Sequence, residues 1–320
     1  MRASRDWCSV PNLSVSIDAG MDPVMDRSEI MGSGDRRRAG EADCRDDIIR
    51  PLEAGSELTS NHGGAIARFF DAPLGPEGPW ILEFGDRRIL LLGRDTTQSA
   101  MMISDPDHLL YDYTKVMMGF VLLYRAPGRI DMIGLGGGSL AKYCYRRLPS
   151  ARIVVAEIDP AVIALRKRFA IPDDDERFQI ECVDGAQFIG AGAEVADVLC
   201  VDGFDRDGQP SGLCSQDFYD QCYSRLTPQG ILVVNLCDDP SRYAPIIRRI
   251  KRSFSNNVLV VRAEEQENRV IFAGKSPRVS ALPKLLTDLE TLDTFRDIDM
   301  ETIARRMWRG ALVSSVLNPE

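Results

Sequence analysis

Asp131–Ser139 reads DMIGLGGGS, an apolar strand pattern that runs directly into a glycine-rich turn. Glycine has no Cβ, so this turn can bend sharply and let a ligand approach the backbone closely. A helix is predicted to begin near residue 138, and its first amides and positive dipole end would face the same ligand. The stretch is therefore typical of a nucleotide-binding unit, although the lysine of a triphosphate-binding loop does not follow the glycines.

Strand and helix patterns alternate from residue 129 onward. Strands are expected at 130–134, 153–157, 178–183, 197–202, 230–236, 257–262 and 269–273, with helices at 138–148, 160–170, 185–189, 215–226 and 241–253. This alternation predicts an α/β protein with a doubly wound parallel sheet. The last two strands lie close together in sequence, which suits an antiparallel hairpin at the sheet edge. Such an ending is typical of the Rossmann-like S-adenosylmethionine methyltransferase fold rather than of dehydrogenases.

The segment before this alternation divides into two parts. Residues 1–60 show no sustained period and are expected to be mostly disordered, because they cannot bury enough surface. Residues 61–125 are expected to form a small β-domain with a linking helix. Its features are a hairpin of Trp80–Phe84 and Arg87–Leu92, a strand at about 98–103 and a helix from Asp105 to about Leu123. The Rossmann-like domain then covers 126–275, and 276–320 are expected to form peripheral helices.

Composition excludes several classes of function. The formal charge of −9 and pI near 5.0 argue against a nucleic-acid binder, which needs a basic face. No apolar run approaches the roughly 20 residues that span a bilayer. The 8 cysteines show no Cys-x-x-Cys spacing, and 2 histidines offer little to a metal site. We therefore expect a cytoplasmic protein with free thiols, no metal, and neither a nucleic-acid nor a membrane partner.

Acidic residues end the second and third predicted strands of the alternating region. Glu157 is placed to accept hydrogen bonds from ribose hydroxyls, and the competing role of capping the next helix suits Asp159 better. Asp184 either accepts a hydrogen bond from an adenine amino group or caps the helix at 185–189. Both ligand contacts suit an adenosine moiety.

Two carboxylates, Asp202 and Asp205, follow the fourth strand of that region. They would orient a cationic amine and take a proton from it as it attacks, or they belong to an ordinary polar loop. In an open parallel sheet, ligands bind beyond the carboxyl ends of the strands, where the strand order reverses. The glycine turn and the strand-end acids are therefore predicted to line one pocket.

At these residues the chain resembles the spermidine synthase (polyamine aminopropyltransferase) family, over about residues 65–275. The family's Asp-x-x-Asp loop is matched by Asp202–Asp205, and its Ser-x-x-Phe-Tyr motif by Ser215–Tyr219. Gln98 resembles the family's glutamine before the linking helix, and Tyr111 its tyrosine on that helix. The resemblance implies a small N-terminal β-domain before a methyltransferase-like Rossmann domain, and a cytoplasmic homodimer or homotetramer.

The resemblance also implies an activity, which is the transfer of an aminopropyl group from decarboxylated S-adenosylmethionine to a polyamine such as putrescine. Asp202 would orient and deprotonate the attacking amine. Asp205, Tyr111 and Gln98 would bind the amine substrate. The donor would be held by the glycine turn and the strand-end acids, namely Gly134, Gly136, Gly137, Gly138, Ser139, Glu157, Asp184 and Gly185.

One departure from the family pattern bears on the donor. The family's glycine turn usually continues with an aspartate that holds the donor's ammonium, whereas this chain has Ser139. Loss of that charged partner would remove about 1.5–3 kcal/mol of binding, and Asp112 would replace it only if its side chain points into the site. Intact S-adenosylmethionine becomes admissible as well. The alternatives are therefore a methyltransferase acting on an unknown small substrate and a non-catalytic nucleoside-binding homologue.

Overall fold

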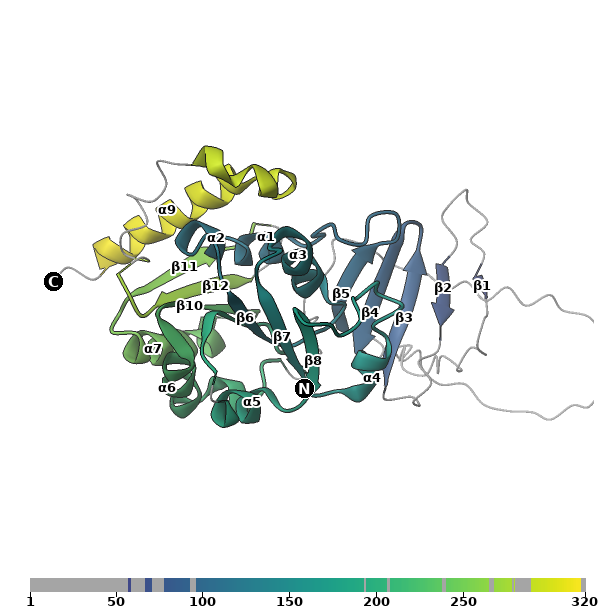
Figure 1. The fold of residues 1–320 in the computed structure, drawn as a ribbon, viewed down its shortest axis with the longest axis horizontal. Helices are drawn as coiled ribbons and strands as arrows, with labels where there is room; N and C mark the ends of the chain where they lie inside the picture. The colour runs from purple at the N-terminus through teal and green to yellow at the C-terminus, as the bar shows by residue number, and fades with distance from the viewer. Residues whose placement is uncertain are drawn as a thin grey trace, which may run out of the picture. The chain divides into compact units, whose positions relative to one another are not determined.

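The computed structural model describes residues 57–58, 67–70, 78–92, 96–192, 194–205, 208–237, 240–264, 268–277, 279 and 289–317. The segment expected to be disordered, 1–60, lies outside these ranges except for 57–58. The described residues form two sheets with helices around the larger one (Figure 1).

The first sheet is antiparallel and follows the chain in the order β1-β2-β3-β4-β5. Its strands are Glu57–Leu58, Ala67–Phe70, Pro79–Phe84, Arg87–Leu92 and Thr96–Met102. The predicted hairpin is confirmed as β3 and β4, and its tight turn uses Gly85 at a φ of +58°. Leu90 pairs with Ser99 while Leu91 pairs with Thr97, so Gln98 is an extra residue in β5. Such a bulge interrupts the alternation of side chains along the strand.

The second sheet has the order β11-β12-β10-β9-β6-β7-β8. Its strands are, in chain order, Arg129–Ile133, Arg152–Glu157, Phe178–Cys182, Ala196–Val201, Leu226–Leu236, Val258–Arg262 and Arg269–Gly274 for β6 to β12. In the row β8-β7-β6-β9-β10 each strand runs parallel to its neighbours. The β12 strand pairs antiparallel with both β10 and β11. The doubly wound sheet with an antiparallel edge hairpin is confirmed. Its strand order reverses between β6 and β9.

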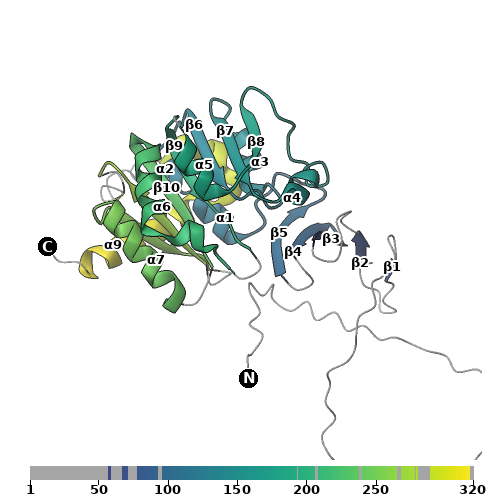
Figure 2. The ribbon, with the colours of Figure 1, turned by 90° about the horizontal axis from the view of Figure 1, so that it is seen from below.

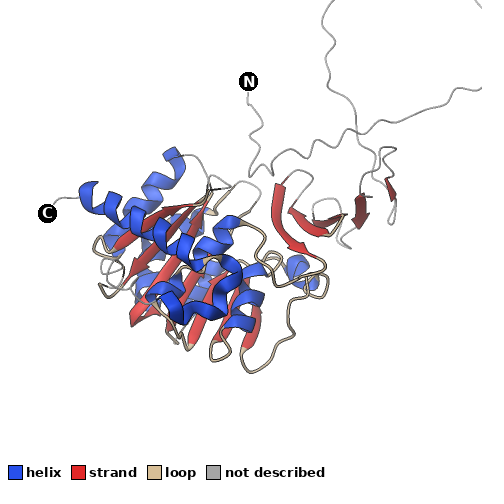
Figure 3. Ribbon diagram, turned by 90° about the horizontal axis from the view of Figure 1, so that it is seen from above, coloured by secondary structure: helices blue, strands red, loops and turns tan. Residues whose placement is uncertain are grey.

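Helices cover both faces of this sheet. The α5, α6 and α7 helices (Gly185–Ala191, Gln216–Arg225 and Pro240–Ser253) lie on one face, in front of the strands in Figure 2. The α1, α2, α3 and α9 helices (Asp112–Met117, Phe120–Leu123, Ser139–Arg147 and Met300–Leu317) cover the other face (Figure 3). Each face has its own apolar core, and β6 contributes Met132 to one and Ile133 to the other. None of the described helices has the length and apolarity needed to cross a bilayer.

Three predicted helices differ from the structure. The helix expected from Asp105 begins only at Asp112 and is interrupted near Gly119. A Cβ on Gly119 would lie 2.8 Å from Met307 Sδ, so α9 packs tightly on this interruption. The α4 helix (Pro160–Ala164) ends six residues before residue 170, and Ala170 has a φ of +52°. Residues Leu289–Ile298 form a 3₁₀ segment, η2, before α9.

Candidate functional site

The glycine turn, Glu157, Asp184 and Asp202 lie at the ends of four strands that are neighbours in the sheet, β6, β7, β8 and β9. Backbone hydrogen bonds continue past the strand ends: Asp202 N donates to Ile133 O, Gly134 N to Ala156 O and Val183 N to Glu157 O. Neighbouring strands lie about 4.8 Å apart, so the row from Asp202 to Asp184 spans roughly 15 Å. An adenosyl group with a short side chain has a comparable length.

The glycine turn fits closely into this row. Gly134, Gly136 and Gly138 have φ values of +93°, +49° and +68°, which side-chain-bearing residues rarely adopt. A Cβ on Gly134 would lie 2.3 Å from Asp202 O, and a Cβ on Gly137 would lie 2.7 Å from Ser99 Oγ. The turn is therefore held between the end of β9 and β5 of the first sheet, and neither position has room for a side chain.

Glu157 is 8% exposed at the end of β7 and holds the glycine turn in place. Its Oε2 accepts a hydrogen bond from Leu135 N at 2.8 Å, and its Oε1 accepts one from Asp159 N at 2.9 Å. A carboxylate has about four lone-pair sites, so two backbone donors leave capacity for ribose hydroxyls. Capping of α4 falls to Asp159, which accepts from Ala161 N, as predicted.

Asp184 caps the α5 helix. Its Oδ1 accepts hydrogen bonds from Ala186 N at 2.9 Å and Gln187 N at 3.0 Å. Gly185 follows without room for a side chain, because a Cβ there would lie 2.5 Å from Ile133 Cγ2. The capping role is therefore present, and an adenine contact through Oδ2 stays a prediction.

Asp202 lies half-buried at the end of β9, where two neutral groups donate to its carboxylate. Asn235 Nδ2 donates to Oδ1 at 2.8 Å, and Tyr113 Oη donates to Oδ2 at 3.3 Å. Burial raises the pKa of this carboxyl above its usual range, although both hydrogen bonds act to lower it. A carboxylate with a raised pKa is a stronger proton acceptor, which is the property that a general base requires.

The three residues predicted to bind the amine differ in how the structure places them. The Tyr111 ring stacks on that of Tyr113, with centroids 6.1 Å apart. Tyr111 therefore contacts the residue that donates a hydrogen bond to Asp202. Asp205 is exposed, and its backbone pairs with Gly208. Gln98 is the bulged residue of β5, next to the Ser99 that contacts the glycine turn. The roles of Tyr111, Asp205 and Gln98 in binding an amine stay predictions.

Ser139 faces a neutral partner. Its Oγ lies 3.5 Å from Ser99 Oγ, at the first turn of α3. One turn further along, Lys142 is buried and its Nζ donates to Phe169 O at 2.7 Å, next to Met101 Sδ at 3.4 Å. Burial lowers the pKa of Lys142 to about 8. The end of the glycine turn therefore pairs a serine with a serine, and a buried lysine lies one turn further along α3.

Asp112 does not supply the charge that Ser139 lacks. Its carboxylate accepts from Arg306 Nη1 at 2.8 Å and from Glu264 N at 2.8 Å, so it is bound to α9 and to the end of β11. Asp112 is 7% exposed, and these contacts fix its direction. The suggestion that it replaces the family aspartate is therefore wrong.

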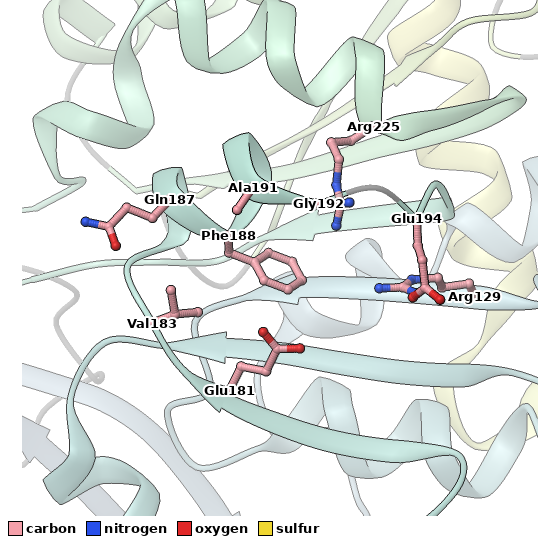
Figure 4. Close-up of a pocket in the computed structure, with 9 residues that line it drawn as sticks. All are labelled: Arg129, Glu181, Val183, Gln187, Phe188, Ala191, Gly192, Glu194 and Arg225. Atoms are coloured by element: carbon pink, nitrogen blue, oxygen red, sulfur yellow. The ribbon is translucent and has the colours of Figure 1, made fainter.

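A separate cavity of about 320 Å³ lies between β8 and α5 (Figure 4). Arg129 and Arg225 reach it, and both pair with the fully buried Asp131, at 2.7 Å and 3.1 Å. None of the residues predicted for the site lines this cavity, although Val183 adjoins Asp184. Asp131, the first residue of the Asp131–Ser139 stretch, thus belongs to a buried ion cluster and not to the row of strand-end acids.

Two partners of Asp202 were missed from the sequence. Tyr113 falls within the helix expected from Asp105 to about Leu123, and Asn235 falls within the strand expected at 230–236. The signal for Asn235 is its position in the otherwise apolar Ile231–Leu236, because a buried amide in a central strand requires a partner. Its second partner is Asn268, which is 1% exposed and donates to Asn235 Oδ1 at 2.9 Å.

Metal ligands and disulfides were both expected to be absent. Within the described ranges, no three His, Cys, Asp or Glu side chains are grouped as a metal site would need. The six cysteines in those ranges are free, namely Cys144, Cys182, Cys200, Cys214, Cys222 and Cys237. Cys8 and Cys44 lie outside them.

Comparisons with known proteins identify relatives of this chain. Residues 111–264 match the family described as spermine/spermidine synthase domain. A polyamine aminopropyltransferase of Neisseria meningitidis serogroup A is 35% identical over 241 residues, which are 74% of this chain and 90% of that protein. The human eEF1A lysine and N-terminal methyltransferase is 26% identical over 210 residues, which are 59% of this chain and 30% of that protein.

A solved structure shares the fold. A probable spermidine synthase from Corynebacterium glutamicum superposes with a TM-score of 0.52 at 17% sequence identity, covering 75% of this chain and 88% of its own. At this identity the likeness concerns the arrangement of helices and strands.

Proposed function

Because the chain belongs to the spermine/spermidine synthase family, we infer that it is an aminopropyltransferase. The donor that we propose is decarboxylated S-adenosylmethionine, and the acceptor is a small polyamine such as putrescine. The net charge of −9 suits a cationic acceptor. We place the enzyme in the cytoplasm, since a reducing compartment suits its free thiols.

The reaction needs an unprotonated amine and a correctly aligned sulfonium. The amine nitrogen attacks the methylene carbon next to sulfur, a new C–N bond forms, and the C–S bond breaks with its electron pair going to sulfur. Sulfur leaves as the neutral thioether methylthioadenosine. The displaced N–H proton passes to the Asp202 carboxylate, whose pKa burial raises.

The observation that best supports this proposal is the close packing of Gly134 against Asp202. Gly134, in the turn that would hold the donor, packs directly against the backbone of Asp202, the residue that would take the proton. Donor and base are therefore assigned to two neighbouring strand ends, which supports alignment without a conformational change. Glu157 and Asp184 extend the same row toward the ribose and the adenine.

The remaining roles follow from position. We assign Tyr111 and Asp205 to the distal, still cationic end of a diamine, and Gln98 to the same substrate from the first sheet. Tyr111 stacks on Tyr113 and adds an aromatic face beside Asp202, which would also attract an ammonium. We assign the contact with the donor's side chain to Gly136, Gly137, Gly138 and Ser139. Gly185, which has no side chain, would let the adenine approach the backbone closely.

A second candidate is a methyltransferase that uses intact S-adenosylmethionine. Ser139 pairs with Ser99, and Asp112 is bound to Arg306, so neither residue offers a free carboxylate that would repel the carboxylate of an intact donor. The similarity to a protein named a lysine and N-terminal methyltransferase adds to this reading.

The test is incubation with each sulfonium donor and a mixture of di- and triamines, read by mass spectrometry. We expect a polyamine heavier by one aminopropyl group, together with methylthioadenosine, from the decarboxylated donor. Products heavier by one methyl group, formed with intact S-adenosylmethionine only, would replace the first candidate by the second. If neither donor is consumed with any acceptor, the chain is a non-catalytic nucleoside-binding homologue.

A further inference from the structure

Arg306 on α9 contacts two segments of the chain, the start of α1 and the residues that follow β11. Its Nη1 donates to both carboxylate oxygens of Asp112 at 2.8 Å, and its Nη2 lies 2.9 Å from Glu264 Oε2. Glu264 N donates to the same Asp112 carboxylate at 2.8 Å. The Arg306 side chain is 14% exposed and that of Asp112 is 10% exposed, so this is a largely buried ion pair in which one guanidinium nitrogen bridges both carboxylate oxygens.

The first segment leads from Arg306 to Asp202 through α1. Asp112 is the first residue of α1, between Tyr111 and Tyr113. Tyr113 donates to Asp202 Oδ2, and the Tyr111 ring stacks on that of Tyr113. Fixing Asp112 therefore fixes the backbone that carries both tyrosines.

The second segment leads to Asp202 through the edge hairpin. Ala263, next to Glu264, donates its N–H to Asn268 O at 3.0 Å. Asn268 Nδ2 donates to Asn235 Oδ1, and Asn235 Nδ2 donates to Asp202 Oδ1. Both donors to the Asp202 carboxylate, Tyr113 and Asn235, are thus connected through neighbouring contacts to the Arg306 guanidinium.

We propose that Arg306 is a positioning residue that holds Tyr113 and Asn235 on the two oxygens of Asp202. Buried ion pairs contribute little net stability compared with apolar packing, whereas they can fix one arrangement among several. The α9 helix is suited to this role because it packs closely, with Gly310 against Val260 O and Met307 over Gly119. It also lies beyond the residues 65–275 that carry the resemblance argued from the sequence. The proposal rests on the proposed role of Asp202.

The test compares Arg306→Met with Arg305→Met. Arg305 is the next residue of α9, 68% exposed, and pairs with Glu301 on the same helix, so its replacement is the matched control. For Arg306→Met we expect kcat to fall roughly tenfold to a hundredfold, with the KM for the donor unchanged. Arg306→Lys keeps one cationic donor and should recover part of the loss. Arg305→Met should match the wild type in every measurement.

The pH profile separates positioning from a general loss of stability. The groups that face the Asp202 carboxylate are Tyr113 Oη from α1 and Asn235 Nδ2 from β10, with the Cys200 thiol two residues back on β9. Weaker donation raises the pKa of Asp202, so the acid limb of kcat/KM should move to higher pH in Arg306→Met. A merely structural role would lower the amount of folded enzyme and leave this limb in place.

The outcomes distinguish this proposal from the proposed function. If Asp202→Asn retains normal turnover, the role of Asp202 fails, and the positioning role fails with it. If Asp202→Asn is impaired but Arg306→Met keeps the wild-type acid limb, only the positioning role is overturned. Should Arg306→Met not fold, Asp112→Asn applies the same criterion, since it keeps the shape of the partner and removes its charge.

Discussion

Asn235 Nδ2 lies 2.8 Å from Asp202 Oδ1, so a neutral amide in a central strand holds the carboxylate at the end of the neighbouring strand. A cation in that position would favour the ionised carboxylate strongly and make it a poor proton acceptor. The Asn235 amide orients the carboxylate and lowers its pKa less than burial raises it. This arrangement supports the role of proton acceptor that we propose for Asp202.

Asn235→Ala should shift the pH dependence of activity. The amide donates to the ionised form of Asp202, so its removal raises the pKa further and moves the acid limb of kcat/KM upward by about one pH unit. Rate measurements between pH 5 and about 9 would test this. Asn257→Ala, at the start of the edge hairpin, is the control, because Asn257 bonds to Gly274 O and not to the site. An unmoved acid limb would argue against Asp202 as the titrating base.

Asp202→Asn should lower kcat by roughly 10² to 10⁴. The asparagine keeps Oδ1 as an acceptor for Asn235, so the fold is expected to persist while the proton acceptor is lost. Steady-state rates with saturating donor and amine measure the effect. Asp217→Asn, an exposed carboxylate on α6, should be unchanged. Near-normal turnover of Asp202→Asn would contradict the general-base role.

The same variant should be more stable than the wild type at neutral pH. The folded pKa of Asp202 is raised above the unfolded value of about 3.9. Ionisation of Asp202 therefore destabilises the folded wild type. The wild type loses this part of its stability as pH rises from the unfolded pKa through the folded pKa. Thermal midpoints of both proteins should differ at pH 7 in favour of the variant and converge near pH 4. A wild type that is the more stable protein at pH 7 would show that burial is not the main influence on Asp202.

Asp131→Asn should destabilise the protein strongly with little direct effect on chemistry. Asp131 is 0% exposed and pairs with Arg129 and Arg225. Arg129 keeps its pair with Glu194, but the buried Arg225 loses the carboxylate that it pairs with, at a cost of about 3–5 kcal/mol. Denaturant unfolding measures the change. Glu194→Gln also removes a carboxylate that pairs with Arg129, but Glu194 is 62% exposed and should cost under about 1 kcal/mol. Equal effects of the two changes would refute the buried cluster as a determinant of stability.

Ser139→Asp should restore discrimination between the two donors. A carboxylate at the end of the glycine turn would bind the ammonium of the decarboxylated donor and repel the carboxylate of intact S-adenosylmethionine. A charged hydrogen bond of about 1.5–3 kcal/mol corresponds to a change of roughly 10- to 150-fold in relative affinity. Calorimetry with both donors measures it, and Ser139→Ala is the control that removes the hydroxyl without adding charge. Unchanged relative affinities would mean that residue 139 does not contact the donor's side chain.

The sheet could be predicted from the sequence because its signal is local. Apolar strands such as 153–157 alternate with helices, and the carboxyl ends of parallel strands must share one edge, which brings Glu157, Asp184 and Asp202 together. The partners of Asp202 depend on side chains from β10 and α1 that meet only after folding. The Asp112–Arg306 pair joins residues 194 positions apart, and no local pattern signals it. The domain bounds near 60, 125 and 275 stay predictions.

The contact of Ser99 with Gly137 has a consequence for how such enzymes can evolve and be engineered. One wall of the cradle that we propose for the donor is contributed by a strand of the small N-terminal sheet. Trimming the chain to its larger sheet would therefore leave the cradle open on that side, and exchanging the small sheet between relatives would also exchange part of their donor selectivity. The two sheets should be inherited as one functional module.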